Sequence, residues 1–410
     1  MARRLVVVLL LALTLAGCAS PAAERAAPEA TPEGAIGDDA PVNLFLLDAL
    51  RPFTSTVSNG AEPQILVTND GSTILVGDVS GVSRSVDGGA TWTRMSAPLL
   101  PGLFADGWAL AQDDAGRLYA STTQGQAMNV DVSDDNGRTW QASGIVGEGL
   151  IVETSSIADR PWLAARGDGD AALLMNGDRG ESCARTTDGG RTWLDRSVIP
   201  TAASPNAGSA AYDSRGRLWF TNGATVYRWN VPCSGNPSVL QLPATGAQIL
   251  TQLRLDALDR PYVAAPSGNN GQMLLFSNQP GLGWKTLTVS PPELKSNTFG
   301  SVDVRDDGQV AVAWYASETA GDPSNLNFQG VWNVYVARID GFWTATPTIT
   351  YDRLTTSANH NGGYCMGGVT CTSGRDLLDY FGIDHAPDGS LHIAFGDDSG
   401  SAKVVYAHLS

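Results

Sequence analysis

Two short segments of this sequence carry side chains whose types and spacing could do chemistry. The segment 159–162, DRPW, places an acid, a guanidinium group and an aromatic ring together, and the segment 374–381 carries Arg375, Asp379 and Tyr380. A guanidinium group presents a planar fork of donors that binds a carboxylate through two hydrogen bonds. A carboxyl group can give and take protons, and a phenol can act as a nucleophile. Both segments are therefore candidates for a ligand-binding or catalytic site.

An eight-residue pattern occurs three times, as SVDGGATW, SDDNGRTW and TTDGGRTW. In a tight turn the Asp carboxylate accepts backbone N–H bonds, the Gly adopts a positive φ, and the Ser or Thr hydroxyl ties the two strands together. We expect the Trp ring to pack between strands of its own sheet. All these tasks are structural. The box residues are Ser85, Asp87, Gly89 and Trp92, then Ser133, Asp135, Gly137 and Trp140, then Thr186, Asp188, Gly190 and Trp193.

A second turn signal, an apolar strand that runs into Asp-Gly or a variant of it and then into another apolar strand, recurs along the chain. Its turn positions are separated by 45, 53, 47, 43, 49 and 81 residues, which gives seven units. Repeats of about 40–50 residues with four short strands each are typical of a β-propeller. The sequence therefore predicts an all-β fold of seven four-stranded antiparallel blades, with turns at Gly71, Gly116, Gly169, Gly216, Asp259, Gly308 and Gly389.

The eight-residue pattern resembles the Asp box, or BNR repeat, of the sialidase (neuraminidase) superfamily. The resemblance covers most of the chain from about residue 42 onward. In that family the boxes lie at the periphery of the propeller, away from the catalytic centre. The resemblance implies a sialidase-like propeller, and six blades, the number in true sialidases, is the alternative count.

The resemblance also implies a particular catalytic arrangement. A sialidase uses three arginines to grip the substrate carboxylate, a Tyr nucleophile primed by a Glu, and an Asp as acid and base. Catalytic sialidases carry an Arg-Ile-Pro motif before the first box, whereas the nearest segment here is Arg51-Pro52-Phe53. The candidate residues are Arg160, Arg375 and either Arg51 or Arg254 for the guanidinium groups, Asp159 or Asp379 for the acid, Tyr380 for the nucleophile, and Glu62 or Glu153 for its partner.

Strand parity indicates which end of the propeller carries the site. The turns between strands 1 and 2 and between strands 3 and 4 of an antiparallel blade share one end, so both repeated turn signals lie there. The other end receives the longest insertions, 316–332 and 350–378, and long ordered loops are commonly functional. We expect a glycan or protein ligand at this loop-bearing end, with Trp108, Trp162 and Arg254 as binding residues.

Two functions remain open. One is an exo-glycosidase acting on sialic acid or a related acidic sugar, and the other is a non-catalytic module that binds a glycan or a protein. A structural interpretation of the segment 159–162 also remains open, with Asp159 and Arg160 as an ion pair between neighbouring blades.

The N-terminus resembles a bacterial lipoprotein signal, with Arg3-Arg4, an apolar run over 5–15 and the sequence LAGC ending at Cys18. Such a run is too short for the ~20 residues that span a bilayer as a helix. The resemblance implies cleavage before Cys18 and lipidation of that cysteine, so that the protein is exported and held on a membrane, facing the periplasm or the exterior. An ordinary secretory peptide is the alternative.

These features divide the chain into a signal peptide, 1–17, a flexible tether rich in Ala, Pro and Glu, 18–41, and a propeller, 42–410. The apolar run Val42–Leu47 is a free strand that could complete the last blade and close the ring.

Charge and composition exclude several functions. The 26 basic residues against 42 acidic ones argue against nucleic-acid binding, which needs a basic surface. The chain has no Cys-x-x-Cys pair and no His pair at helical spacing, so we expect no zinc site. The Asp spacing in 166–178 leaves calcium as an alternative, although the segment lacks the full loop with its closing Glu. We expect no other cofactor, and a monomer.

Cysteines behind an export signal usually pair. Cys365 and Cys371 are close enough in sequence to clip one loop, which leaves Cys183 and Cys233 as the second pair.

Overall fold

The computed structural model describes residues 52–96, 105–124, 127–143, 150–153, 158–177, 180–199, 207–243, 251–365, 373–375, 377 and 381–410. The chain divides into two units, 1–44 and 45–410, of which the first lies outside the described residues. The predicted signal peptide, Cys18 and the tether therefore lie outside them too. Among the described residues, no helix has the length and apolar character needed to cross a membrane.

The second unit is built from strands, as the turn spacing predicts. Seven antiparallel sheets of four main strands follow one another along the chain, which confirms the seven-bladed propeller over the six-bladed alternative. Blades 1 to 3 are β2 (Gln64–Val67), β3 (Ile74–Asp78), β4 (Gly81–Ser85) and β5 (Thr93–Arg94); β6 (Ala105–Gln112), β7 (Leu118–Gln124), β8 (Ala127–Ser133) and β10 (Leu150–Glu153), with β9 (Gln141–Ala142) also on β8; and β11 (Ala158–Arg166), β12 (Asp170–Gly177), β13 (Gly180–Thr186) and β14 (Leu194–Ile199).

Blades 4 to 7 continue the same order. They are β15 (Ala207–Tyr212), β16 (Leu218–Asn222), β17 (Thr225–Trp229) and β18 (Ser238–Gln241); β19 (Gln252–Leu255), β20 (Pro261–Pro266), β21 (Met273–Gln279) and β22 (Gly283–Thr288); β23 (Ser296–Val304), β24 (Val310–Ser317), β25 (Val331–Asp340) and β26 (Thr348–Arg353), with β27 (His360–Asn361) also on β25; and β28 (Gly382–His385), β29 (Leu391–Asp397), β30 (Lys403–Leu409) and β1 (Phe53–Ser58). One short 3-10 helix, η2 (Gly268–Asn270), follows β20.

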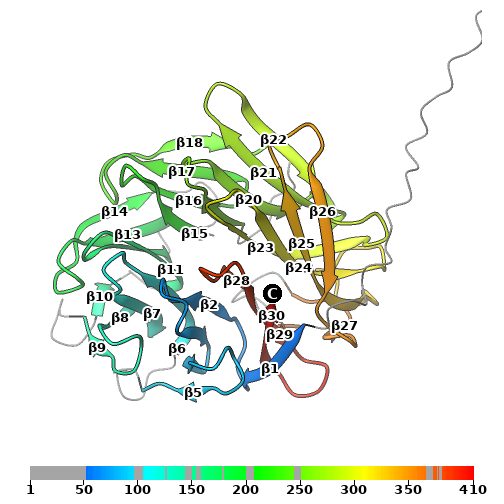
Figure 1. Ribbon diagram of the computed structural model, residues 1–410, viewed down its shortest axis with the longest axis horizontal. Coiled ribbons are helices and arrows are strands. Elements are labelled where there is room, and N and C mark those ends of the chain that lie inside the picture. Colours follow the sequence, from blue (N-terminus) through cyan, green and yellow to red (C-terminus); the bar gives the residue numbers. More distant parts are fainter. Residues whose placement is uncertain are drawn as a thin grey trace, which may run out of the picture. The chain divides into compact units, whose positions relative to one another are not determined.

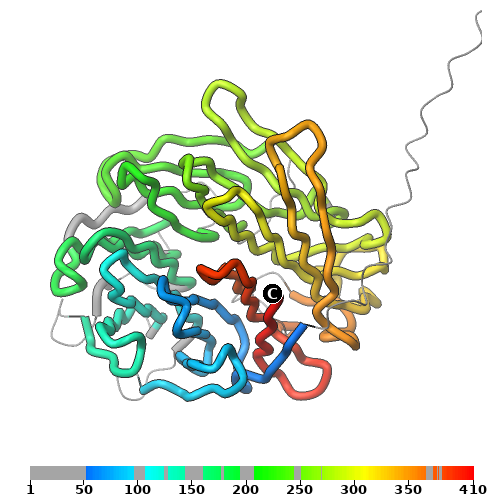
Figure 2. Tube along the Cα trace, in the orientation of Figure 1, coloured from blue at the N-terminus to red at the C-terminus, as the bar shows by residue number. Residues whose placement is uncertain are grey.

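The blades form a closed ring. Each innermost strand (β2, β6, β11, β15, β19, β23 and β28) contacts the innermost strand of the next blade, and β28 contacts β2 (Figure 1). The ring closes because the N-terminal strand β1 pairs with the C-terminal strand β30, so the blue and red ends of the described chain lie side by side (Figure 2).

The closing strand itself differs from our expectation. It is β1, FTSTVS, and not the apolar run Val42–Leu47, which lies outside the described residues. An outermost strand leaves part of its surface in solvent, so Thr and Ser serve there as well as apolar residues do. In β1, Val57 packs against the apolar cluster between blades 7 and 1.

The hydrophobic core is divided among the seams between blades. Seven clusters of buried apolar side chains are present in the described residues, one for each pair of neighbouring blades. A single four-stranded sheet cannot bury both of its faces alone, and stacking around the ring buries them.

The Asp boxes help to hold these seams. In the first box Ser85 Oγ lies 2.8 Å from Asp87 Oδ1, Gly89 N donates to Ser85 Oγ at 2.9 Å, and Thr91 N donates to Asp87 Oδ1 at 2.9 Å. The other two boxes repeat these bonds within about 0.1 Å. The predicted turn chemistry is therefore present.

The box tryptophans differ from our expectation in one respect. They do not pack between strands of their own blade but against the preceding blade, where Trp92 meets the ring of Tyr406 edge-on with centroids 5.3 Å apart. The box glycine makes this approach possible, because a Cβ on Gly89 would lie 2.1 Å from the same ring. Leu75 and Val132 take the place of Tyr406 for the second and third boxes.

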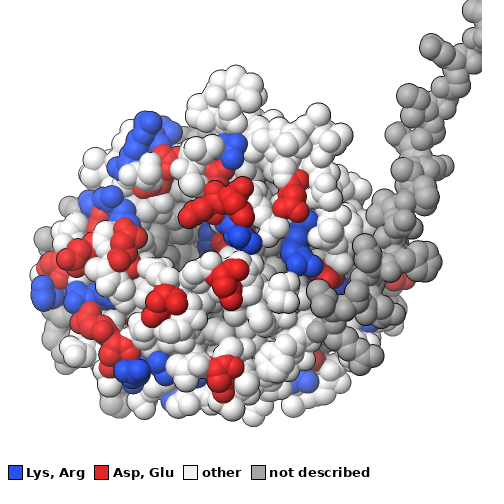
Figure 3. Space-filling view, viewed as in Figure 1, with Lys and Arg blue, Asp and Glu red and all other residues white. Residues whose placement is uncertain are grey.

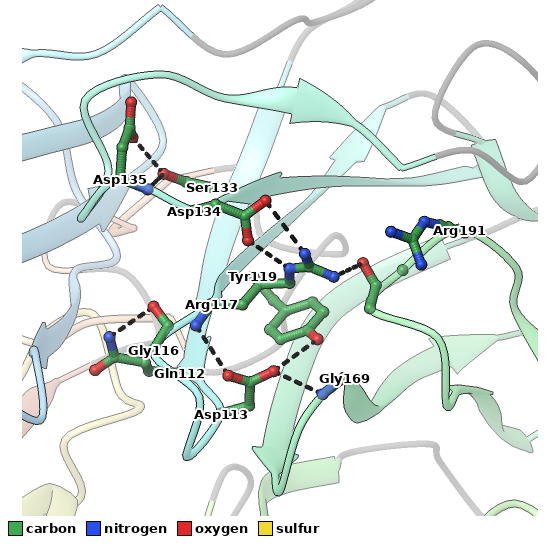
Figure 4. Close-up of polar contacts among 12 residues, drawn as sticks. Gln112, Asp113, Gly116, Arg117, Tyr119, Ser133, Asp134, Asp135, Gly169 and Arg191 are labelled. Atoms are coloured by element: carbon green, nitrogen blue, oxygen red, sulfur yellow. Dashed lines mark hydrogen bonds and ion pairs between the residues drawn. The ribbon is translucent and has the colours of Figure 1, made fainter.

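Both repeated turn types lie at one end of the ring, as strand parity requires. Arg117, in the first turn of blade 2, pairs with Asp134 at 2.6 Å and donates to Gly189 O, in the Asp box of blade 3, at 3.0 Å (Figure 4). The buried carboxylate of Asp113 accepts from Arg117 N and from Gly169 N of blade 3, both at 2.9 Å. Polar contacts thus connect neighbouring blades at the turn-bearing end.

Candidate functional site

Several of the predicted site residues lie where innermost strands begin, at the loop-bearing end. Four residues occupy equivalent places in blades 1, 2, 3 and 6: Glu62, Gly107, Arg160 and Phe299. Each lies four residues before an equivalent residue of its innermost strand, which is Leu66, Ala111, Ala164 or Asp303, and all four have a positive φ of 51–60°. In the left-handed region a residue with a Cβ costs roughly 1–2 kcal/mol more than glycine. Blade 2 uses glycine at this position, whereas blades 1 and 3 keep charged residues.

Two of the predicted catalytic residues come together at this end. An Arg375 Nη2 atom lies 3.7 Å from Glu62 Oε1. The Glu62 side chain is 6% exposed and the Arg375 side chain 31% exposed, so the acid is buried and the guanidinium group reaches solvent. The inserted segment before blade 7 is thereby connected to the start of blade 1.

Arg160 is buried, with 7% of its surface exposed. Asp159, its neighbour on β11, belongs to a strand whose backbone is described, but its side chain lies outside the described residues. The expected ion pair between Asp159 and Arg160 therefore stays a prediction.

The predicted aromatic binding residues are corrected in their placement. Trp108 is 1% exposed and Trp162 is 5% exposed, and both rings lie in apolar clusters between blades. Trp162 Nε1 donates to Ala207 O of the next blade at 2.7 Å. Both residues end a bulge, in β6 and β11, and both rings lie in the seams, so neither presents an open face on which a ligand could stack.

Arg254 lies toward the other end of the channel. Its register position on β19 matches Ala164 of β11, four residues beyond Arg160, or about 13 Å along a strand. Its Nε atom lies 3.3 Å from Asp303 Oδ1. Arg254 therefore does not join Arg160 and Arg375 in one layer of the ring.

The remaining predicted site residues are Arg51, Asp379, Tyr380 and Cys371, which lie outside the described residues, and Glu153, whose side chain does. Cys183 and Cys233 form the predicted disulfide, with Cα atoms 5.2 Å apart, and it joins blade 3 to the turn after β17 in blade 4. Cys365 is disulfide-bonded as well. Within the described ranges, no group of three or more His, Cys, Asp or Glu side chains is arranged to hold a metal ion.

A second group of charged residues, which sequence reasoning missed, lies around the axis. The innermost strands share one register position at which the side chain points toward the next blade. The residue at this position is apolar in blades 1 to 4 and charged in blades 5 to 7. The position is occupied in order by Leu66, Ala111, Ala164, Ala211, Arg254, Asp303 and Asp384. This layer of the seams is thus apolar between blades 1 and 5 and charged between blades 5 and 1.

These charged residues are connected across three seams. Asp303 Oδ2 accepts from His385 N at 2.9 Å and lies 2.8 Å from His385 Nδ1, while Asp384 Oδ2 accepts from Val67 N at 2.6 Å. Burial, and then the negative charge of Asp303, raise the pKa of Asp384 to about 8. Asp384 is therefore largely a neutral carboxylic acid at pH 7.

Asp303, Asp384 and His385 line a cavity of ≈ 640 Å³ that opens among the turns of blades 1, 2, 6 and 7. The face shown in Figure 3 is hollowed near the centre of the ring, and acidic side chains lie around the hollow. Aligning the seven sequence repeats on their turn positions would have revealed these residues, because the residue five places before each turn position changes from Leu and Ala to Arg and Asp.

Comparisons with known proteins bear on the fold. No family model and no curated protein sequence matches the chain. A GH74 enzyme from Niastella koreensis superposes with a TM-score of 0.51 at 17% identity, over 86% of this chain and 55% of the enzyme. The extracellular domain of a hybrid two component system from B. thetaiotaomicron superposes with a TM-score of 0.51 at 12% identity, over 87% of this chain and 41% of that one.

These likenesses show a shared propeller fold, and the chain spans about half the length of each of the two proteins. The disulfide is consistent with an exported protein.

Proposed function

We propose that this protein is a lipid-anchored, non-catalytic propeller of the cell surface that binds an acidic glycan at its loop-bearing end. The observation that carries the proposal is the left-handed backbone of Glu62 and Arg160, two buried charged residues at equivalent places in blades 1 and 3. Strained, over-determined backbone positions cluster at binding and active sites. Glycine at the same place in blade 2 indicates that the fold itself does not need a charged side chain there.

The ligand class follows from the guanidinium groups. Arg375 reaches solvent beside Glu62, and Arg160 starts an innermost strand two blades away. A guanidinium fork matches a carboxylate through two hydrogen bonds, and its direction is fixed when the side chain is packed. A sugar acid is therefore the proposed ligand. Capture of acidic glycans on an array would favour it over a protein ligand.

Hydrolysis of a sialoside is the second candidate. It is favoured by the contact between Glu62 and Arg375, which brings the proposed partner of the nucleophile next to the segment that contains Tyr380. The position of Arg254 weighs against it. That side chain is paired with Asp303 and lies about four residues along the strands from the other two arginines, so it is badly placed to share one substrate carboxylate with them.

The test uses the full chain with Cys18→Ser, which removes the proposed lipidation site. Capture on a glycan array is compared among this protein, Arg160→Ala, Arg160→Lys and the control Arg191→Ala, an exposed arginine of the third Asp box. We expect binding of acidic glycans to fall at least tenfold in Arg160→Ala and Arg160→Lys and to persist in Arg191→Ala. Equal capture by all four proteins would overturn the proposal.

Two further measurements accompany the array. Release of a fluorogenic sialoside by the parent protein and its loss in Arg160→Ala would establish the hydrolase in place of the binding module. For the anchor, we expect wild-type cells to incorporate a labelled fatty acid into the protein and cells with Cys18→Ser to incorporate none. Each acyl methylene that enters the bilayer contributes ~0.8 kcal/mol to membrane binding.

A further inference from the structure

Acidic residues outnumber basic ones around the axial cavity at the turn-bearing end. Four of its lining residues are aspartates, Asp303, Asp306, Asp307 and Asp384, and one is an arginine. That arginine, Arg305, pairs with Asp307 at 3.0 Å. Arg254 pairs with Asp303 from the neighbouring strand. Asp306 and Asp384 remain as acids that no positive side chain of the described residues neutralises within ion-pair distance.

One lining side chain carries a polar atom without a partner. His385 has a side chain that is 6% exposed, its Nδ1 atom contacts Asp303 Oδ2 at 2.8 Å, and its Nε2 atom has no hydrogen bond within the described residues. In a neutral ring whose Nδ1–H donates to a carboxylate, Nε2 is an acceptor. A buried acceptor without a donor costs roughly 1–3 kcal/mol, so the site is incomplete as it stands.

We propose that this cavity binds a small organic molecule through its primary ammonium group. An ammonium group has three N–H donors and no acceptor. His385 Nε2 and the carboxylate of Asp306 can accept from such a group. The carboxyl of Asp384 already accepts from Val67 N through Oδ2 and becomes a stronger acceptor on losing its proton. A volume of ≈ 640 Å³ lies within the ordinary range of small-molecule sites.

Two other ligand classes fit less well. A metal ion would need a group of His, Cys, Asp and Glu side chains in ligand geometry, and the described residues contain none of three or more. A neutral polyol would satisfy His385 but would leave Asp306, and Asp384 once it ionises, without a positive group. Both classes are included in the test as outcomes.

Binding should be linked to protons through Asp384. The titratable and charged groups that face it are Asp303 on β23, Arg254 on β19, His385 on its own strand, and Arg305, Asp306 and Asp307 in the turn after β23. The residues that β2 and β6 contribute to the cavity are not titratable. An ammonium ion favours the ionised form of Asp384, which in the free protein becomes dominant only above pH 8.

The experiment measures the dissociation constant for ethanolamine by calorimetry in phosphate, an amine-free buffer, with the full chain carrying Cys18→Ser. Ethylene glycol is the neutral probe of matched size, and calcium chloride is the metal probe. We expect ethanolamine to bind at least tenfold more tightly than ethylene glycol. Its affinity should rise about twentyfold from pH 6.5 to pH 8.5, since only the ionised Asp384 binds it fully.

Two variants test the residues. Asp384→Asn keeps an oxygen that can accept from Val67 N, so this contact between blades 7 and 1 is retained. The variant should weaken ethanolamine binding at pH 8.5 at least tenfold and flatten its pH dependence. His385→Gln, a second variant should the first fail to fold, should weaken binding several-fold. The charge-matched control is Asp168→Asn, an exposed turn residue outside the cavity lining, and it should bind as the parent does.

The proposal is overturned by any of four results: no binding of ethanolamine up to about 100 mM, equal binding of ethylene glycol, binding of calcium in its place, or unchanged binding by Asp384→Asn. Glycan capture at the opposite end of the ring is expected to survive Asp384→Asn. Failure of one site can therefore be distinguished from failure of the other.

Discussion

Trp193 and Ser143, on neighbouring blades, are joined by a hydrogen bond of 2.6 Å from the indole Nε1 to the serine Oγ. The same hydroxyl donates to Gly190 O, inside the Asp box, at 2.5 Å. Ser55 of the closing strand makes the same two bonds to the first box. Its hydroxyl accepts from Trp92 Nε1 at 3.0 Å and donates to Gly89 O at 2.6 Å. One serine thus fastens a whole box to the preceding blade.

The second box lacks this fastening. Met95 occupies the place of Ser143, since Met95 N donates to Val82 O and Ser143 N to Val130 O, both at 2.8 Å. Trp140 Nε1 consequently has no hydrogen-bond partner within the described residues, although the ring is buried.

We predict that the two tryptophans respond differently to replacement by phenylalanine. Trp193→Phe should lower the free energy of unfolding by about 1–2 kcal/mol more than Trp140→Phe does, because Trp140 loses no hydrogen bond. Ser143→Ala should cost about 1–3 kcal/mol, and the two losses should be non-additive in the double variant Ser143→Ala/Trp193→Phe. Urea denaturation measures all four. Equal costs for the two tryptophans would show that the indole bond contributes nothing.

The disulfide between blades 3 and 4 leads to a second prediction. The double variant Cys183→Ala/Cys233→Ala should lose about 2–4 kcal/mol of unfolding free energy, because the bridge closes a 50-residue separation in the unfolded chain. Denaturation of the variant tests this without a reductant, so that the disulfide of Cys365 stays intact. A midpoint equal to that of the parent protein would mean that stacking of the seams alone holds these blades together.

The architecture could be predicted because the repeated signals report local backbone needs. Asp-Gly turns and Asp boxes have the same chemistry in every blade, so their spacing predicts the number of blades. The closing strand was misplaced because β1 is an outer strand of alternating Thr and Ser, which an apolar search passes over. Burial of Trp108 and Trp162 escaped prediction for a related reason, since the direction of a side chain at a bulge depends on the left-handed residue before it.

The charged residues around the axis were not predicted, because they belong to three different repeats. Arg254, Asp303 and Asp384 are separated by 49 and 81 residues, and no short motif joins them. Each stands in an ordinary strand segment, so its charge looks like that of a solvent-exposed strand residue. Only the shared register position around the ring brings the three side chains to one layer.

The left-handed residues lead to a third prediction, in which stability and binding change in opposite directions. Glu62→Gly and Arg160→Gly should each raise the free energy of unfolding by about 1 kcal/mol, because glycine adopts a positive φ without the Cβ penalty. The same substitutions should reduce capture of acidic glycans. Gly107→Ala, at the equivalent position of blade 2, is the matched control and should lower stability by a similar amount. A lower free energy of unfolding in the two Gly variants would show that the charged side chains stabilise the fold.

Asp131 leads to a prediction about pH. This fully buried residue is the cross-strand partner of Ala120, which packs in the seam between blades 1 and 2, and its Oδ2 atom has no partner within the described residues. Burial raises the pKa of Asp131 to about 7, while Asn129 opposes the shift through a bond of 3.2 Å. The folded protein therefore keeps this proton up to about pH 7, whereas the unfolded chain releases it near pH 4.

It follows that this group makes the folded protein less stable as the pH rises from about 4 to about 7, with no further change above that range. Asp131→Asn removes the titration, so the variant should gain on the parent across that interval, by about 4 kcal/mol in total once the pH reaches 8. Thermal melting of both proteins at pH 5, 6, 7 and 8 measures the difference. Asp87→Asn, a change in the first Asp box, should shift the melting temperature by an amount that does not vary over this range, because hydrogen bonds from Thr91 hold the pKa of the Asp87 carboxyl at about 2. A difference in melting temperature between Asp131→Asn and the parent that stays constant with pH would show that Asp131 does not titrate in this range.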